Sequence, residues 1–182
     1  ADVRDVVVFN RKHMDGTPLT LDSLPPNAVI GTSSARRRSV LKRSYPQFTF
    51  KDIRGNVRTR LRRLDDDANG YDAIVLAAAG LQRLNMDARI GQFLDVTFMP
   101  HAIGQAALGV QVRSSDDQHS NAIAEMVHAA IHNADAALRC ELERSFLREI
   151  GGGCSLPLAI HSSLVKSEDG AHKVDATAFV FS

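Results

Sequence analysis

The chain has 182 residues, of which 44% are hydrophobic and 24% are charged, and its formal net charge is +1 at pH 7. This composition is typical of a soluble globular protein, and the length suffices for one core or for one core and a small appended domain. Two cysteines are too few for a disulfide framework, and we find neither a membrane-length apolar run nor a signal segment, so we expect a reducing, cytoplasmic location.

Short apolar strands and helices alternate through the first half of the chain. Strands are expected at residues 6–9, 28–32, 47–53 and 71–76. A first helix is expected from a serine N-cap at 33 or 34 to about residue 43. A second is indicated by the apolar face that Val57, Leu61 and Leu64 share. A third is expected after a small-residue turn at 77–80 and runs through Leu84. This alternation predicts an α/β fold with a parallel or mixed sheet flanked by helices.

In such sheets, ligands bind at the carboxyl ends of the strands, opposite the N-termini of helices. Four residues follow predicted strands at these turns: Ser33, Ser34, Arg54 and Gly80. We therefore expect them to lie on one rim of the sheet.

The second half of the chain has a different pattern. A glycine-punctuated segment at 104–113 is followed by helical patterns at 120–130 and 134–150, and then by alternating strands at 156–164 and 173–181. We place a boundary near residues 114–120 and interpret the remainder as a small α+β domain.

Basic residues are concentrated in one stretch of the chain. Half of the 22 Lys and Arg residues lie between positions 36 and 63, where Asp52 is the only acidic residue. They are Arg36, Arg37, Arg38, Lys42, Arg43, Lys51, Arg54, Arg58, Arg60, Arg62 and Arg63. A strong local positive field is expected, and it implies an anionic ligand.

Residues 31–38 combine a strand end, two serines and three arginines. A helix N-terminus in this setting offers free N–H groups and a positive dipole end, and Arg36 and Arg37 can grip carboxylates in bidentate fashion. Alternatively, a serine simply caps the helix and the arginines are solvated. The sequence leaves these interpretations evenly balanced, because arginines at a helix N-terminus oppose the dipole and need a reason.

A second turn, at residues 52–60, carries further basic groups. Gly55 is expected to turn the backbone sharply, so that Arg54 points to the rim and Arg60 lies near the start of the next helix. The other arginines of this helix, Arg58, Arg62 and Arg63, are expected to form a solvated face.

Three glycines at 151–153 precede Cys154. A cysteine on such a loop is open to covalent chemistry, although loop cysteines are more often incidental; Cys140, within a helix, is expected to be a small core residue. His128 and His132 share a helix face, but no third ligand is evident, so the sequence does not indicate a metal site.

Taken together, these stretches resemble porphobilinogen deaminases (hydroxymethylbilane synthases), in order and spacing, across nearly the whole chain. The matching motifs are Gly31-Thr32-Ser33-Ser34 with Arg36-Arg37, Arg54-Gly55-Asn56-Val57 with Thr59-Arg60-Leu61, Asp72-Ala73-Ile74-Val75-Leu76-Ala77, Ala79-Gly80-Leu81 with Arg83-Leu84, Gly104-Gln105, and Gly152-Gly153-Cys154.

The resemblance implies a periplasmic-binding-protein-like domain with a mixed sheet flanked by helices, followed by a small α+β C-terminal domain. Residues 1–98 would form domain two, residues 99–116 would return to domain one, and residues 117–182 would begin domain three.

The resemblance also implies a function. The family condenses four porphobilinogens, with loss of ammonia, into hydroxymethylbilane for haem biosynthesis, on a dipyrromethane cofactor that Cys154 would hold by a thioether bond. By the same resemblance, cofactor and substrate acids would be bound at Ser34, Arg36, Arg37, Arg54, Gly55, Arg60 and Arg83. The expected partner is the small molecule porphobilinogen, with no metal, nucleic acid or membrane, and the complete protein would be a monomer.

The chain departs from the family pattern in three respects. The family's catalytic aspartate and its neighbouring lysine lie before residue 1, so this chain is not expected to catalyse the reaction unaided. Ala106 stands where the family usually has glycine, and His101 replaces a common proline.

Two other functions compete with this one. A non-catalytic relative would bind a tetrapyrrole or its precursor without being loaded at Cys154. A nucleic-acid or polyanion binder would use the basic stretch, but it predicts interleaved aromatic residues for stacking, and only Tyr45, Phe48 and Phe50 lie near.

Overall fold

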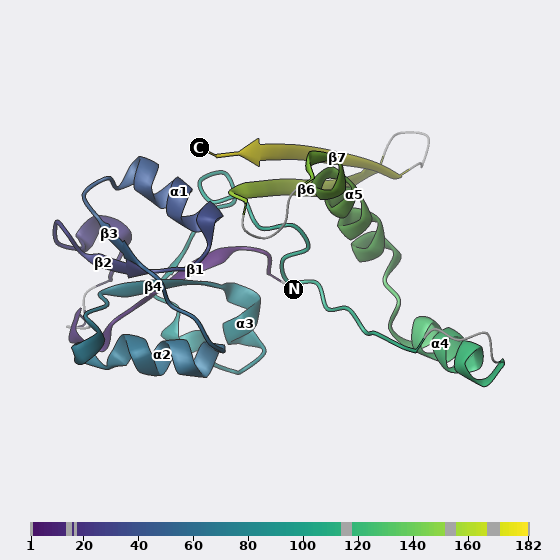
Figure 1. The fold of residues 1–182 in the computed structure, drawn as a ribbon, viewed down its shortest axis with the longest axis horizontal. Helices are drawn as coiled ribbons and strands as arrows, with labels where there is room; N and C mark the ends of the chain where they lie inside the picture. The colour runs from purple at the N-terminus through teal and green to yellow at the C-terminus, as the bar shows by residue number, and fades with distance from the viewer. Residues whose placement is uncertain are drawn as a thin grey trace.

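The computed structural model describes residues 2–13, 16, 18–113, 118–151, 156–166 and 172–181. Its first part holds a five-stranded sheet of order β3-β2-β4-β1-β5 (Figure 1). The strands are β1 (Asp5–Phe9), β2 (Val29–Gly31), β3 (Thr49–Lys51), β4 (Ala73–Ala77) and β5 (Gln92–Phe93). β2 is parallel to β3 and β4, whereas β1 is antiparallel to β4 and β5. The predicted mixed sheet is confirmed, and the strand expected at 47–53 is shorter than predicted.

Helices cover both faces of this sheet, as predicted. α1 (Ala35–Ser44) lies on one face, and α2 (Val57–Asp65) and α3 (Ala78–Gln82) lie on the other (Figure 1). Short 3-10 helices occupy Arg11–His13, Leu21–Ser23, Asp67–Asn69 and Asp87–Arg89.

The turn predicted at 77–80 is wrong, because α3 begins directly after β4. Alanine has the highest helix propensity of all residues, and the small buried side chains of Ala78 and Ala79 let the helix start close against the sheet.

Two apolar clusters form the core, one on each face of the sheet. Val7 and Phe9 of β1 pack with residues of α1, among them Val40 and Leu41. Their neighbours Val6 and Val8 point to the opposite face and pack with residues of α2 and α3, among them Leu61, Leu64 and Leu81. Because both faces are covered, β1 is a continuous apolar run from Val6 to Phe9, without the polar alternation of a half-exposed strand.

The second part contains α4 (Gln118–Ile131), α5 (Ala134–Ile150) and the antiparallel pair β6 (Leu158–Lys166) and β7 (His172–Val180). α5 packs against β6, whereas α4 lies away from both sheets (Figure 1). Asn133 caps α5 by accepting from the Ala136 N–H at 2.9 Å, and the helix ends before Gly151, whose φ is 73°. The predicted helices and strands of this half are confirmed to within a few residues.

No helix among the described residues is both long enough and apolar enough to cross a membrane.

Candidate anion-binding site

The turn between β2 and α1 is built by its hydroxyl groups. The Ser34 side chain caps α1 by accepting from the Arg37 N–H at 3.4 Å, and Thr32 Oγ1 accepts from the Ser34 N–H at 3.2 Å. Ser33 Oγ lies 3.1 Å from both the N–H and the carbonyl oxygen of Ile53, which follows β3. This contact joins the carboxyl ends of β2 and β3, as the predicted rim requires.

Arg36 and Arg37 turn inward from the start of α1 toward one carboxylate. Asp5, at the start of β1, is fully buried, and its two oxygens lie 2.7 Å from Arg36 Nη1 and 2.7 Å from Arg37 Nη2. The Arg37 contact is an aligned hydrogen bond, whereas the Arg36 contact has ion-pair distance without hydrogen-bond alignment. Arg36 also donates to the Pro100 carbonyl oxygen at 2.7 Å, and Arg37 to the Val75 carbonyl oxygen at 3.0 Å.

Asp5 is the reason why two arginines can stand at a helix N-terminus. Burial raises the pKa of Asp5, but the charges of Arg37 and Arg36 outweigh burial and hold this pKa below its ordinary value. Burial lowers the pKa of Arg36, and Asp5 opposes that shift. Removing one partner from such a buried pair typically costs about 3–5 kcal/mol, because it leaves an uncompensated buried charge.

The segment after Pro100 completes this cluster. Gln105 Nε2 donates to Asp5 Oδ1 at 3.0 Å and to the Val3 carbonyl oxygen at 2.7 Å, and its Oε1 accepts from Arg36 Nη2 at 3.4 Å. Ala106, the next residue, has a φ of 70°, in the left-handed region that favours glycine. Arg83, at the end of α3, donates to the Ala106 carbonyl oxygen. This backbone conformation gives a physical reason for the glycine that the resemblance implies at position 106.

The turn between β3 and α2 carries the second group of predicted residues. Gly55 has a φ of 114°, and a Cβ there would lie 3.0 Å from Thr59 Cγ2, so the expected sharp turn is confirmed. The side chain of Arg54 is exposed, and Arg60 Nε donates to the Gly55 carbonyl oxygen at 2.7 Å. Burial and the positive charge of Arg37 lower the pKa of Arg60.

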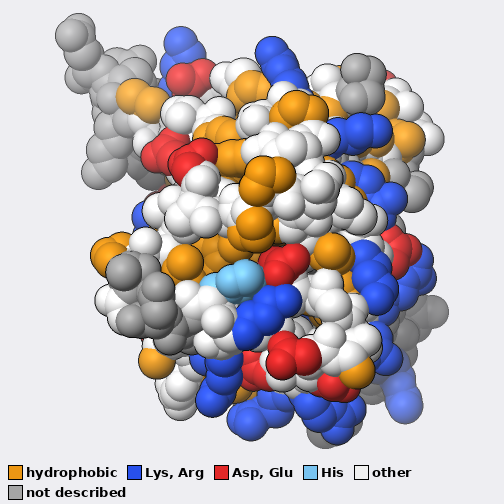
Figure 2. Space-filling model, turned by 90° about the vertical axis from the view of Figure 1, so that its left-hand side faces the viewer, with side chains coloured by type: hydrophobic (Ala, Val, Ile, Leu, Met, Phe, Trp, Pro, Cys, Tyr) orange, Lys and Arg blue, Asp and Glu red, His pale blue; other side chains and the backbone are white. Residues whose placement is uncertain are grey.

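The remaining arginines of α2 behave as a solvated face. Arg58, Arg62 and Arg63 are exposed, and Arg63 donates to the Arg54 carbonyl oxygen at 3.1 Å. On the face shown in Figure 2, basic side chains gather over the lower part of the molecule, with acidic side chains among them.

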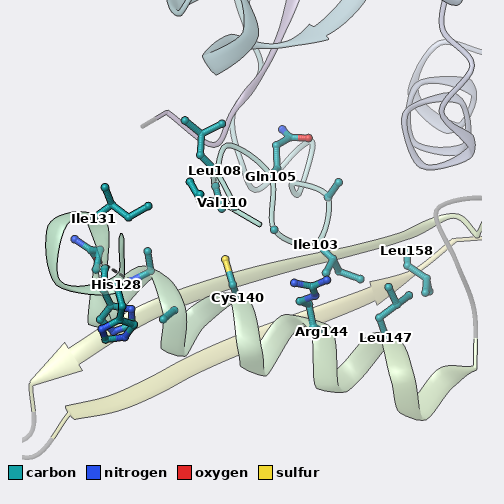
Figure 3. Close-up of a pocket in the computed structure, with 18 of the residues that line it drawn as sticks. Ile103, Gln105, Leu108, Val110, His128, Ile131, Cys140, Arg144, Leu147 and Leu158 are labelled. Atoms are coloured by element: carbon teal, nitrogen blue, oxygen red, sulfur yellow. Dashed lines mark hydrogen bonds between the residues drawn. The ribbon is translucent and has the colours of Figure 1, made fainter. Parts of the chain in front are cut away.

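A cavity of about 960 Å³ opens beside Ser34, Arg36 and Arg37. Its other walls come from residues 102–112, from α4 and from α5, and they are mainly apolar. In Figure 3, Cys140 and Arg144 of α5 point toward the loop that carries Ile103 and Gln105. Cys140 is half-buried against this space, so it is less enclosed than the core residue we predicted. A volume of this size accommodates a small organic ligand.

Glu143 of α5 holds the same loop from the opposite side. Its buried carboxylate accepts from the Gly104 N–H at 2.6 Å and from the Ser162 hydroxyl at 2.5 Å. His101 is buried nearby, and its Nδ1 donates to the Ala102 carbonyl oxygen at 3.1 Å, while its ring meets that of His161 edge to face. The loop that carries Gln105 is thus fixed between the arginine cluster and α5.

His101 provides a prediction of pH dependence. Burial lowers its pKa below 6.5, although the hydrogen bond to Ala102 and the charge of Glu143 oppose that shift. Below pH 6.5 the unfolded chain therefore binds a proton that folded His101 does not, so the free energy of unfolding should fall from that pH toward the folded pKa. Urea unfolding from pH 8 to 5 should show a shallower loss of stability in His101→Phe. An equal loss in both proteins would contradict this assignment.

Sequence reasoning missed Asp5, Glu143 and the structural use of Gln105. Asp5 could have been noticed as a charged residue adjoining a strand that is otherwise continuously apolar.

Cys154 lies outside the described residues. His128 and His132 stack at 4.1 Å, and among the described residues no group of three potential ligands could hold a metal ion.

The geometry defines an α/β protein with a cationic rim suited to carboxylates. A family model described as "Porphobilinogen deaminase, dipyromethane cofactor binding domain" matches residues 1–121, and one for the C-terminal domain of porphobilinogen deaminase matches residues 137–182. This chain belongs to the porphobilinogen deaminase family, and its residues 1–121 match the dipyrromethane cofactor binding domain of that family.

Individual relatives agree with the family model. Porphobilinogen deaminase of Eremothecium gossypii is 41% identical over 175 residues, which cover 89% of this chain and 52% of the relative. That of Prochlorococcus marinus is 41% identical over 167 residues (92% and 50%), and that of Dictyostelium discoideum is 36% identical over 177 residues (97% and 52%). The chain thus spans about half the length of the curated relatives it matches.

Proposed function

We propose that this chain forms the carboxylate-binding and cofactor-carrying part of a porphobilinogen deaminase. The whole protein would condense four porphobilinogens, with loss of ammonia, into hydroxymethylbilane for haem biosynthesis. The observation that carries this proposal is the buried arginine pair, Arg36 and Arg37, at the start of the helix that follows a parallel strand, within a region that matches the dipyrromethane cofactor binding domain.

The domain organisation is part of the proposal. Residues 1–98 would be a periplasmic-binding-protein-like domain two, and their sheet, with apolar clusters on both faces that these residues mainly build, supports this division. Residues 99–116 would return to domain one. Leu108 and Val110, which are 77% and 60% exposed, have the apolar character of a segment that packs against another part of the whole protein. Residues 117–182 would begin domain three.

The residues present fit a dipyrromethane group. Each pyrrole of this group carries acetate and propionate side chains, which are planar anions that arginine binds better than lysine does. The positive charge of Arg37 lowers the pKa of Arg60, and a bound anion would offset this repulsion. Arg54 and Arg83 are exposed, and in this proposal they would bind further carboxylates, Arg83 in exchange for its hydrogen bond to the Ala106 carbonyl oxygen.

In this proposal the protein side chains bind the pyrrole carboxylates and orient the pyrrole rings. Arg37, Arg60 and the Ser34 hydroxyl would fix pyrrole carboxylates at the rim, and Arg36 would support them from its buried position. Gly55 would shape the backbone beside them. When bound through Cys154, the dipyrromethane would supply the pyrrole terminus to which new units are joined.

The partner in this proposal is a small molecule, with no nucleic acid, and the whole protein would act as a monomer. The side chains of Arg36 and Arg37 are only 4% and 11% exposed, and both face Asp5. Arginines enclosed in this way suit a small carboxylate that enters a cavity better than a phosphate backbone that runs over a surface.

Arg37→Gln tests the carboxylate role. Loss of a charged hydrogen bond costs about 1.5–3 kcal/mol, so the KM for porphobilinogen in the whole protein should rise tenfold or more. Arg58→Gln, which changes an exposed arginine on the solvated face of α2, is the matched control and should change KM less than about twofold. Urea midpoints of both variants show whether the fold is retained. An unchanged KM in folded Arg37→Gln would remove this residue from the site.

A further inference from the structure

Three side chains contact the carboxylate of Asp5. Arg36 Nη1 and Arg37 Nη2 reach its carboxylate from α1, both at 2.7 Å, and Gln105 Nε2 reaches it at 3.0 Å from the loop after Pro100. The Asp5 side chain has no exposed surface, so no substrate can touch it in this arrangement. Any contribution of Asp5 to ligand binding must therefore act through the groups that it holds.

The arginine pair has a physical need for such a partner. Two adjacent guanidinium groups repel each other, and the positive end of α1 repels both. Without a carboxylate beneath them, these side chains would lower their energy by turning toward solvent. Asp5 fixes one terminal nitrogen of each arginine, and the Val75 carbonyl oxygen fixes the other terminal nitrogen of Arg37.

On the basis of the proposed function, we propose that Asp5 is a positioning residue for substrate carboxylates and acts through Arg37. It holds the guanidinium plane in place before the ligand arrives, so that binding does not have to order a long, flexible side chain. Asp5 also cancels one of the two arginine charges, which lets both arginines lie beside a largely apolar cavity.

The test is a double-mutant cycle in the whole protein, with porphobilinogen as substrate. Asp5→Asn keeps the shape of the side chain and removes its charge, and it should raise KM about tenfold while kcat changes less than about threefold. In the Arg37→Gln background the same Asp5 substitution should change KM less than about twofold, because the residue through which it acts is gone. Asp2→Asn, which changes the part-exposed contacts between Asp2 and Arg4, is the matched control.

Two results would overturn this role. One is an unchanged or lower KM in Asp5→Asn. It would mean that removing the negative charge of Asp5 strengthens substrate binding at least as much as the lost orientation of Arg37 weakens it. The other is an equal tenfold rise with or without Arg37, which would indicate a general structural effect. Failure of the proposed function is distinguishable, because the unsubstituted protein would then not consume porphobilinogen at all, and the role of Asp5 would fall with it.

A charge-balanced pair keeps the test valid if Asp5→Asn alone does not fold. Arg36→Met removes one of the two buried cations that would lose their carboxylate, so Asp5→Asn combined with Arg36→Met keeps the net charge of the parent cluster and should fold. Comparison of this double variant with Arg36→Met alone should show the same rise of about tenfold in KM. Equal KM values in the two proteins would overturn the proposal.

Discussion

Replacement of Cys154 by serine is expected to abolish covalent attachment of the dipyrromethane cofactor. A thiolate is a strong nucleophile near neutral pH, whereas a serine hydroxyl without an activating base is not ionised and cannot form the thioether. Intact-mass measurement of the unsubstituted whole protein should show an excess of two linked pyrrole units, and peptide mapping should place it on Cys154. The serine variant should have the bare mass of the chain.

Cys140→Ser is the matched control for this prediction. Cys140 is the other cysteine of the chain and lies half-buried on α5, facing the cavity beside the arginine cluster. Its replacement should leave the adduct intact. Recovery of a thioether-linked dipyrrole on Cys140, or loss of the adduct from both variants, would contradict the assignment of Cys154. A bare mass in the unsubstituted protein would favour a relative that binds precursors without being loaded.

Gly31→Ala is expected to cost about 1–3 kcal/mol of folding free energy, since overpacking a well-packed core has this magnitude. A Cβ at Gly31 would lie 2.8 Å from Ile74 Cγ2 and 3.0 Å from Tyr71 Cδ1. Ile74 is fully buried, and the Tyr71 hydroxyl donates to the Asp52 carbonyl oxygen at 2.7 Å, so neither side chain can move away freely. The loss should appear as a lower urea midpoint with an unchanged slope.

Gly80→Ala is the control that separates crowding at Gly31 from a general intolerance of replacing glycine by alanine. A Cβ at Gly80 would lie 3.5 Å from Val57 Cγ2, which is an ordinary contact, and the residue lies within α3. Alanine is favoured over glycine in a helix by roughly 0.5–1 kcal/mol, so this variant should be as stable as the parent or slightly more stable. If Gly31→Ala proved as stable as Gly80→Ala, the close packing of β2 against Ile74 would be wrong.

The sequence by itself determined the features that depend on neighbours in the chain. Ser34 and the arginines after it follow a strand and begin a helix, so their place at the rim could be predicted from local pattern alone. The sharp turn at Gly55 and the solvated face of Arg58, Arg62 and Arg63 were likewise local properties. The motifs of these turns also sufficed to indicate the family, because they recur in a fixed order along the chain.

Only the tertiary structure decided what holds the arginines. Asp5 lies 32 residues before Arg37 and 100 residues before Gln105, and the three meet because β1 inserts antiparallel beside β4. The left-handed backbone of Ala106 and the support that Glu143 gives to Gly104 arise in the same way, from a loop held between two parts of the molecule. Hydrophobic periodicity specifies which face of a strand is buried, but it does not specify which distant strand or loop lies beside it. The neutralisation of a buried charge is set by that pairing, so it could be read only from the folded chain.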